Sequence, residues 1–437
     1  MDLPPIVAAD TAWMLVASAL VLLMTPGLAF FYGGLVRSKN ALNTMMMSFV
    51  ALGVVGVLWA LVGYSLAFAS GGEWVGGPAH LALSGVDLAA KGTIPHLLFL
   101  AYQGTFAIVT AALISGAIVE RMRFGAYVAF VGAWSVAVYA PVCHWVWGGG
   151  WLADLGALDY AGGTVVHVNA GAAALVAAWV LGPRKDHGRQ ALVPHNVPFA
   201  LLGASLLWFG WFGFNAGSAL AASPGAVLAF VNTLLAPAAA LVAWVGVDLA
   251  RTGRATAVGA VTGVVVGLVA ITPAAGFVGP LAALAIGALG VLPSYWLIVR
   301  RSRTRLDDSL DVAAAHGTGG LVGAVLTGVF AQSAWGGVDG LVGGRPVQVL
   351  LQLLGALAVL VYSLGASWVL LRVIGLVVPL RADRRQEGVG LDVVEHGEEA
   401  YGSDAGAILL LPDEGSPGAS RETTHMRPVP SAVRGEA

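Results

Sequence analysis

Two histidines stand out in this sequence because they lie inside long apolar stretches. His167 comes eight residues after Asp159, and His316 comes five residues after Asp311. An ionisable side chain inside a membrane is costly, so each histidine is a candidate functional residue. A lone buried histidine often only bonds a backbone carbonyl, but two at matching positions favour a shared function. Because two histidines without further ligands make a poor zinc centre, no metal site is predicted.

A carboxylate precedes the stretch that contains His167. Asp159 lies just before Gly162 and Gly163. At the start of a helix a carboxylate accepts hydrogen bonds from the first backbone N–H groups and is favoured by the helix dipole. Asp159 is therefore expected to cap the helix that carries His167.

Aromatic residues form a second candidate site. The run Trp211–Ser218 combines aromatic rings with an amide and a hydroxyl, and Phe106 and Trp147 add further rings from other stretches. A small cation gains cation–π attraction from such rings where carboxylates are absent. Tryptophans near a membrane surface are also common interfacial anchors, and spacing alone does not separate the two interpretations.

The composition indicates the environment in which these residues act. Of the 437 residues, 58% are hydrophobic and only 11% are charged, against roughly 25% in soluble domains. The mean hydropathy is +0.82. A net charge of −2 without a basic patch argues against nucleic acid as a partner, and the single Cys143 excludes a disulfide scaffold. The chain is therefore predicted to be a polytopic protein of the lipid bilayer.

Eleven apolar stretches are long enough to cross about 30 Å of hydrocarbon as helices. They are Thr11–Gly33, Ala41–Ala69, His96–Ile118, Gly125–Trp145, Gly162–Leu181, Pro198–Gly217, Gly225–Leu249, Ala255–Thr272, Ala275–Val299, Asp308–Phe330 and Val349–Val378. They lack the apolar–polar alternation of transmembrane β-strands, so an all-α fold is predicted. Helices 1–5 and 6–10 are expected to form two halves of inverted topology, with the histidines between them and helix 11 added.

The lysines and arginines are distributed unevenly between the two sides. Most of them follow helices 1, 3, 5, 7, 9 and 11, whereas the loops on the other side hold only Lys91 and Arg345. Cytoplasmic loops are enriched in positive charge. The N-terminus is therefore expected outside the cell membrane and the C-terminus in the cytoplasm.

Several segments resemble the ammonium transporter family (Amt/Mep/Rh), and specifically its Amt branch of bacterial or archaeal type. The resemblance covers essentially Ala9 to Tyr401, with its motifs in the expected order. They are Gly27–Arg37, Asp159–His167 followed by Gly182–Arg184, Trp211–Ser218 and Ile271–Pro273. The resemblance implies a homotrimer of eleven-helix subunits, each with its own pore.

The resemblance also implies roles for the aromatic residues. By motif match, Trp147, Phe106 and Ser218 would form an outer ammonium site. Phe214 would stack on Phe106 below that site, and the two rings would act as a gate. Asp159 would support the recruitment site without touching the substrate.

His167 and His316 would be the paired pore histidines of this family. An unpaired ion in a dry channel costs tens of kcal/mol, whereas releasing the proton of an amine with a pKa of about 10.4 costs about 4–5 kcal/mol at pH 7. Conduction of neutral ammonia with separate proton transfer is therefore expected. Imidazoles titrate near neutrality and could carry that proton. The expected protein is a transporter or channel without cofactors, and not an enzyme.

The C-terminal part is predicted to divide into two segments after a transmembrane domain of residues 1–380. Residues 381–401 contain Glu387–Asp392 and resemble the family's cytoplasmic region, which in bacterial relatives serves regulation by PII signal proteins. Residues 402–437 are predicted to be disordered. Two alternatives stay open. The first is an Rh-like gas channel, but the Trp211–Ser218 run argues against it. The second is an ammonium sensor, which normally carries a signalling domain, and this tail is too short to supply one.

Overall fold

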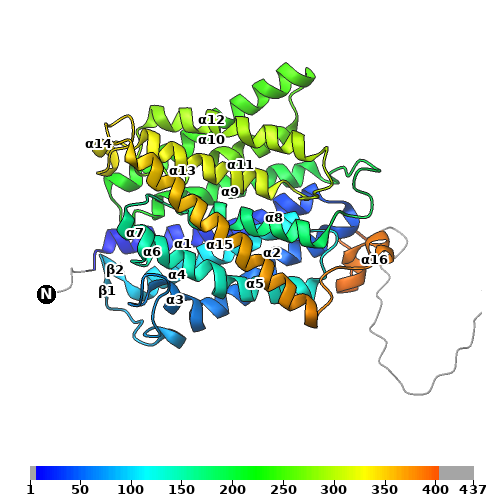
Figure 1. Cartoon of the computed structure of the whole chain (residues 1–437), viewed down its shortest axis with the longest axis horizontal. Helices are drawn as coiled ribbons and strands as arrows, with labels where there is room; N and C mark the ends of the chain where they lie inside the picture. The colour runs from blue at the N-terminus through cyan, green and yellow to red at the C-terminus, as the bar shows by residue number, and fades with distance from the viewer. Residues whose placement is uncertain (1–5, 403–437) are drawn as a thin grey trace, which may run out of the picture.

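The computed structural model describes residues 6–402, and the predicted disorder of the tail lies outside the described residues from residue 403 on. The described chain is a bundle of membrane-length helices (Figure 1). The helices are α1 (Ala8–Leu35), α2 (Ala41–Leu58), α3 (Tyr64–Phe68), α4 (His96–Leu113), α5 (Phe124–Trp134), α6 (Ala140–Trp147), α7 (Trp151–Leu155), α8 (Asn169–Leu181), α9 (Val197–Gly217), α10 (Pro224–Thr252), α11 (Ala257–Ile271), α12 (Pro280–Arg301), α13 (Gly319–Phe330), α14 (Ser333–Gly336), α15 (Val347–Val377) and α16 (Arg384–Val389). The strands β1 (Ala90–Lys91) and β2 (Ile94–Pro95) pair as a short antiparallel hairpin.

Several membrane helices contain π-helical segments, which the apolar pattern did not indicate. These are η2 (Trp59–Gly63), η5 (Ser135–Tyr139), η6 (Gly163–Val168) and η7 (Ala313–Thr318), and η8 (Asp392–His396) lies in the C-terminal segment. The segments η6 and η7 begin the two helices that carry His167 and His316. Single π-helical turns are rare and occur frequently at functional sites.

The eighth predicted span differs from the expectation. It forms α11, whose 15 residues are fewer than the roughly 20 that cross a bilayer. This helix packs against α9, α10, α12 and α13, and its second half is buried. A helix enclosed by others need not reach both lipid surfaces, so residues 6–402 contain ten membrane-length segments and this shorter helix in the predicted order.

Small residues bring the helices of the two halves close together. A Cβ atom added to Gly171 in α8 would overlap the backbone of Gly317 in η7, and one added to Gly203 in α9 would overlap the backbone of Phe31 in α1. Close backbone approach at glycine is how membrane helices gain packing energy without a hydrophobic driving force. The first helices of both halves and the two histidine helices therefore pack in pairs, as an inverted repeat requires.

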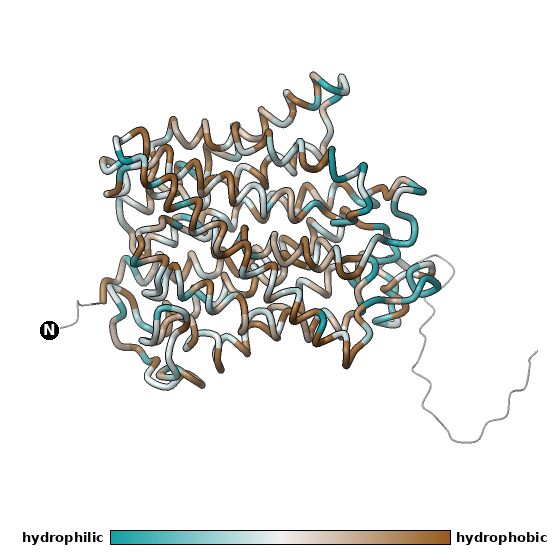
Figure 2. The backbone as a smooth tube through the Cα atoms, viewed as in Figure 1, coloured by the Kyte–Doolittle hydropathy of each residue, from teal (hydrophilic) through white to brown (hydrophobic). Residues whose placement is uncertain are grey.

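The two ends of the bundle differ in charge. The start of α1 and the β1–β2 hairpin lie at one end, here called the hairpin end, and α16 lies at the other (Figure 1). The end with α16, here called the basic end, also holds Arg37 and Arg184. Polar residues gather at both ends, while the helices between them are mostly hydrophobic (Figure 2).

Candidate functional site

The two predicted histidines meet near the centre of the bundle. Nδ1 of His167 lies 3.2 Å from Nδ1 of His316, and the ring planes are 24° apart. Both residues are buried. Two neutral imidazoles at this distance share one hydrogen bond, in which one ring donates and the other accepts. Nε2 of His167 is buried and has no protein partner within the described residues, so it can bond a small molecule in the adjacent cavity.

Each histidine helix begins at a capping aspartate. The Asp159 carboxylate accepts hydrogen bonds from the N–H groups of four residues, Gly162, Gly163, Thr164 and Val165, at 2.7–3.0 Å. This is the predicted cap of the fifth membrane helix. On the other histidine helix, Asp308 takes this position and accepts from Val312 and Ala313 at 3.0 and 2.7 Å.

Asp311, the aspartate singled out from the sequence, does not cap its helix. Its carboxylate pairs with Arg301 at 2.6 Å. Asp311 has a φ of +60°, so the chain turns there before the helix begins. Asp159 and Asp308 each precede their histidine by eight residues, and this equal spacing was the signal in the sequence that pointed to Asp308.

The predicted aromatic residues come together at the hairpin end of the histidine pair. The rings of Phe106 and Phe214 stack with centroids 4.1 Å apart, and Trp147 meets Phe106 edge-on at 5.9 Å. The Ser218 hydroxyl donates to the Phe214 carbonyl at 2.9 Å and lies 3.3 Å from the Tyr102 hydroxyl. These side chains come from α4, α6, α9 and the residue directly after α9, so the fold unites segments that are far apart in the sequence.

Trp147 also connects the aromatic group to the cap of η6. Its indole N–H donates to the Asp159 carbonyl at 2.8 Å. The Asp159 carboxylate meanwhile accepts from the backbone of η6, the segment that carries His167. Asp159 therefore fixes both the aromatic group and the histidine helix from a single position.

A narrow cavity lies between the aromatic stack and the histidines. Its volume is about 10 Å³, roughly the space for one water molecule, and its walls include Phe214, Val265 and Leu207. Trp211 stacks on His167 with ring centroids 5.3 Å apart and donates its N–H to the Thr272 hydroxyl at 2.9 Å. The sequence singled out the run that contains Trp211 but not its contact with the histidine.

A wider cavity of about 350 Å³ extends from His316 toward the basic end. Polar side chains line it, among them Asp248, Ser309 and Asp311. The two cavities share His316 and Val265 as lining residues, so they lie in series on either side of the histidine pair. The narrow cavity has mostly apolar walls, and the wider one has more polar walls toward the basic end.

Two glutamines that the sequence pattern did not single out hold the loop before Asp159. Gln352 of α15 accepts from the Leu158 N–H at 2.6 Å and donates to the Leu158 carbonyl at 2.6 Å. Gln348, one turn earlier, donates to the Gly156 carbonyl at 2.9 Å. Both glutamines are buried. In the sequence, these residues could have been recognised as two side-chain amides one turn apart in an otherwise apolar helix.

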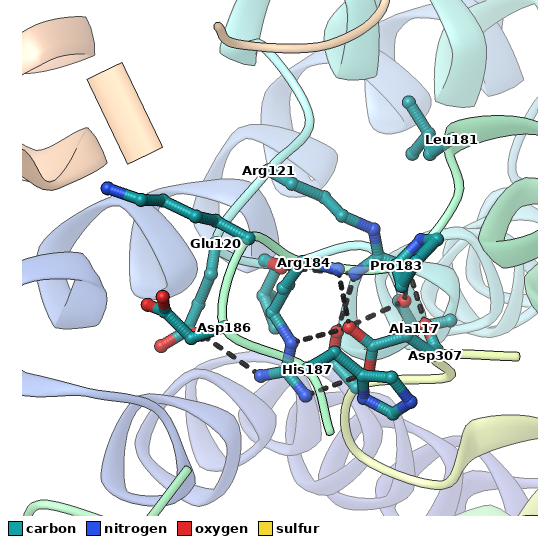
Figure 3. Close-up of polar contacts among 12 residues, drawn as sticks. Ala117, Glu120, Arg121, Leu181, Pro183, Arg184, Asp186, His187 and Asp307 are labelled. Atoms are coloured by element: carbon teal, nitrogen blue, oxygen red, sulfur yellow. Dashed lines mark hydrogen bonds and ion pairs between the residues drawn. The ribbon is translucent and has the colours of Figure 1, made fainter. Parts of the chain in front are cut away.

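A buried ionic cluster closes the basic end (Figure 3). Arg184 lies between Glu120 and Asp307, at 2.9 and 2.8 Å, and Arg37 contacts Glu120 at 3.0 Å. Burial by itself would raise the pKa of the Glu120 carboxyl, but Arg184 and Arg37 outweigh it and hold that pKa below its usual value. Arg184 likewise lowers the pKa of Asp307 against the effect of burial. The cluster ties together the loops after α1, η4 (Ile114–Ala117), α8 and α12.

The segment after α15 docks against the same end. The Glu387 carboxylate accepts from the Lys185 N–H at 2.9 Å, and the Asp392 carboxylate accepts from the Asn43 N–H at 2.7 Å at the start of α2. The Tyr401 hydroxyl lies 2.8 Å from Nε2 of His195. This segment thus contacts the start of α2 and the loop after α8.

Comparison with known proteins gives a consistent result. The sequence model described as Ammonium Transporter Family matches residues 12–401. The chain is 47% identical to an ammonium transporter of Bacillus subtilis, covering 90% of this chain and 98% of that protein, and 51% identical to an ammonium transporter of Aquifex aeolicus, covering 90% and 93%. The fold is similar to the crystal structure of Saccharomyces cerevisiae Mep2, with a TM-score of 0.82, 36% identity and coverage of 92% and 90%.

A solved structure named "Sensor Amt Protein" is also similar, with a TM-score of 0.83 and 31% identity over 89% of this chain and 98% of that one. The match of the family's sequence model to residues 12–401, and the similarity of the fold over nearly the same length, show that this chain belongs to the ammonium transporter family.

Proposed function

We propose that this protein recruits ammonium at the hairpin end, removes a proton and conducts ammonia through the central path. The observation that carries the proposal is the order of the parts along that path. The aromatic group, the narrow apolar cavity and the hydrogen-bonded histidine pair follow one another through Phe214 and His167. The bacterial relatives named as ammonium transporters support the choice of substrate.

Recruitment uses rings and a hydroxyl in place of a carboxylate. Trp147 and Phe106 offer cation–π attraction, and the Ser218 oxygen keeps lone pairs that can accept a hydrogen bond from ammonium. Such a site attracts a small hydrogen-bonding cation but does not hold it as tightly as a buried ion pair would. The Asp159 carboxylate, fully engaged by four backbone N–H groups, stabilises the site without contacting the ion.

Passage beyond the Phe106–Phe214 stack favours the neutral molecule. The cavity behind the stack is lined mostly by apolar side chains, so an ion there would lose its hydration without compensation. Ammonia can still hydrogen-bond to the free Nε2 of His167. The hydrogen bond between His167 and His316 supplies a separate route along which the proton can pass from one imidazole to the other.

We place the hairpin end outside the cell membrane and the basic end in the cytoplasm, because positive charge concentrates on cytoplasmic loops. We further propose a homotrimer with one pore per subunit. The segment 381–401, which docks on the basic end through Glu387 and Asp392, is the proposed regulatory segment and the proposed contact region for a PII signal protein.

Uptake of radiolabelled methylammonium by proteoliposomes, with membrane current recorded in parallel, tests the function. The proposal predicts saturable uptake accompanied by current, because the proton crosses as well. Saturable uptake without current would favour an Rh-like gas channel. Binding without uptake would favour a sensor, the function for which one structural neighbour is named.

A further inference from the structure

A groove separate from the pore lies between α8, η7, α12 and α15, toward the basic end. It has a volume of about 360 Å³. Its walls are mainly apolar and include Leu297 of α12, Leu321 of α13 and Leu360 of α15. Ala314 and Gly317 of η7 form part of the same lining, on the segment that carries His316. Apolar walls of this kind gain dispersion contacts from a hydrocarbon chain, which an empty groove would forfeit.

Unpaired positive charge lies at the mouth of the groove. Arg300 is exposed, and its guanidinium lies 5.6 Å from the centre of the Trp296 ring. Arg303 and Arg305 follow it in the chain and are also exposed, although they do not line the groove. Within residues 6–402 none of these three arginines forms an ion pair, whereas Arg301 is paired with Asp311.

The acidic residue that lines the groove does not offset this charge at the mouth. Asp308 is buried, and its carboxylate accepts hydrogen bonds from the Val312 and Ala313 N–H groups at the start of η7. Its negative charge therefore faces the positive end of the helix dipole. Arg300, the unpaired arginine that lines the groove, remains available to an external anion.

We propose that an anionic phospholipid occupies this groove, with an acyl chain between α12 and α15 and its phosphate against Arg300. The apolar walls favour a lipid over free phosphate, and the unpaired arginines favour an anionic headgroup over a zwitterionic one. The lipid supports η7 from the side opposite the pore. This inference rests on the groove and its charges and does not depend on the transport mechanism.

Native mass spectrometry of the full chain, extracted from vesicles of equal parts phosphatidylcholine and phosphatidylglycerol, tests the proposal. The wild type is expected to retain phosphatidylglycerol in preference to phosphatidylcholine. Arg300→Gln should lower that preference about fivefold, the factor that corresponds to roughly 1 kcal/mol for one arginine near an anionic lipid. Arg372→Gln is the matched control, because Arg372 lies 5.5 Å from the Trp368 ring in α15 but does not line the groove.

A second variant tests the apolar part. Leu360→Trp fills the groove and should remove the retained phosphatidylglycerol, whereas Leu357→Trp, on the exposed face of α15, should not. Equal retention in the wild type and Arg300→Gln, or an equal loss in Arg372→Gln, would overturn the proposal. Two further results would also overturn the proposal. Dissociation of the assembly by Leu360→Trp would identify a second copy of the chain as the occupant of the groove. Increased lipid retention after truncation at Gly402 would identify the tail as the occupant.

Discussion

At the scale of single residues, the proposed selectivity depends on groups that recognise a cation without neutralising it. In this proposal, Trp147, Phe106 and Ser218 replace part of the hydration of ammonium, while the carboxylate of Asp159 accepts hydrogen bonds from the backbone at the start of η6. This division predicts different consequences for the two kinds of residue. Changing the aromatic site should alter apparent affinity, and removing the aspartate should disable the path.

Ser218→Ala combined with Trp147→Leu should raise the KM for methylammonium more than it lowers the maximal rate. The variant removes a hydroxyl acceptor and a ring at the mouth of the path but leaves the histidine pair intact. Concentration-dependent uptake in proteoliposomes measures both parameters. Ser205→Ala is the matched control, because Ser205 also lies in α9 and bonds the carbonyl four residues earlier, but faces outward. An unchanged KM in the double variant would remove these residues from the substrate site.

Asp159→Ala should abolish uptake while the oligomer still assembles in detergent. Loss of a helix cap costs about 0.5–2 kcal/mol, and here it also leaves four N–H groups at the start of η6 without their acceptor. Asp159→Asn should retain some uptake because an amide oxygen still accepts. Asp339→Ala, which removes a carboxylate that accepts from the Ser333 N–H in an exposed loop, serves as the control. Full uptake by the alanine variant would show that Asp159 is dispensable.

At the scale of elements, α15 positions the site from outside it. Gln352 bonds both the N–H and the carbonyl of Leu158, the residue before Asp159, as a neighbouring strand would. The eleventh helix, which lies outside the predicted repeat, thereby fixes the loop that leads to the aromatic site and the histidine helix. A substitution in α15 that breaks these bonds should therefore alter substrate affinity at the mouth of the path.

Gln352→Leu should lower the melting temperature and raise the KM for methylammonium. The variant leaves the N–H and the carbonyl of Leu158, which are part-buried, without their partner, at a cost of up to about 1–3 kcal/mol for each group. Gln352→Glu keeps the acceptor for the Leu158 N–H and should recover part of the affinity. Equal effects of both substitutions on stability without a change in KM would mean that Gln352 serves packing alone.

The order of the elements was predictable from the sequence, but several local features were not. The helices could be located because a bilayer-spanning helix needs a long apolar stretch. The histidine pair could be singled out because histidines are rare in such stretches. Hydrophobic runs do not distinguish α-helical from π-helical turns, so η6 and η7 were not anticipated. Gln352 bonds the backbone of Leu158, and a backbone partner cannot be recognised from residue types in the sequence. Asp311 was the aspartate noted upstream of His316, although Asp308 has the eight-residue spacing that matches Asp159 and accepts the hydrogen bonds at the start of η7.

At the scale of the whole molecule, the basic end is held together by charge. Glu120, Asp307 and Arg184 join the loops after η4, α8 and α12, and backbone hydrogen bonds such as that from the Ser309 N–H to the Ala117 carbonyl add to these ion pairs. Breaking a buried pair by removing one partner costs about 3–5 kcal/mol because a buried charge is left uncompensated. The end of the bundle that carries the C-terminal segment is therefore expected to respond to acid.

The pKa values of Glu120 and Asp307 are lower in the folded protein than their usual values, so their contribution to stability is present above the unfolded pKa of about 4 and is lost as pH falls. The melting temperature of the wild type should fall steeply below about pH 4. Glu120→Gln should be less stable at pH 7 and show a shallower fall on acidification. The exposed Glu398→Gln is the control and should follow the wild type. Parallel curves for the wild type and Glu120→Gln would contradict the assigned role of this cluster.

The central claim is that the hydrogen-bonded pair of His167 and His316 gives the path its ammonium selectivity and carries the separated proton. The most direct test is current evoked by ammonium beside current evoked by potassium, recorded from proteoliposomes that hold the wild type or the His167→Ala/His316→Ala double variant. The account predicts ammonium current without potassium current in the wild type, and loss of proton-coupled ammonium current or of selectivity against potassium in the variant. Full ammonium current with unchanged selectivity in the double variant would contradict the account, because the two histidines would then contribute packing only.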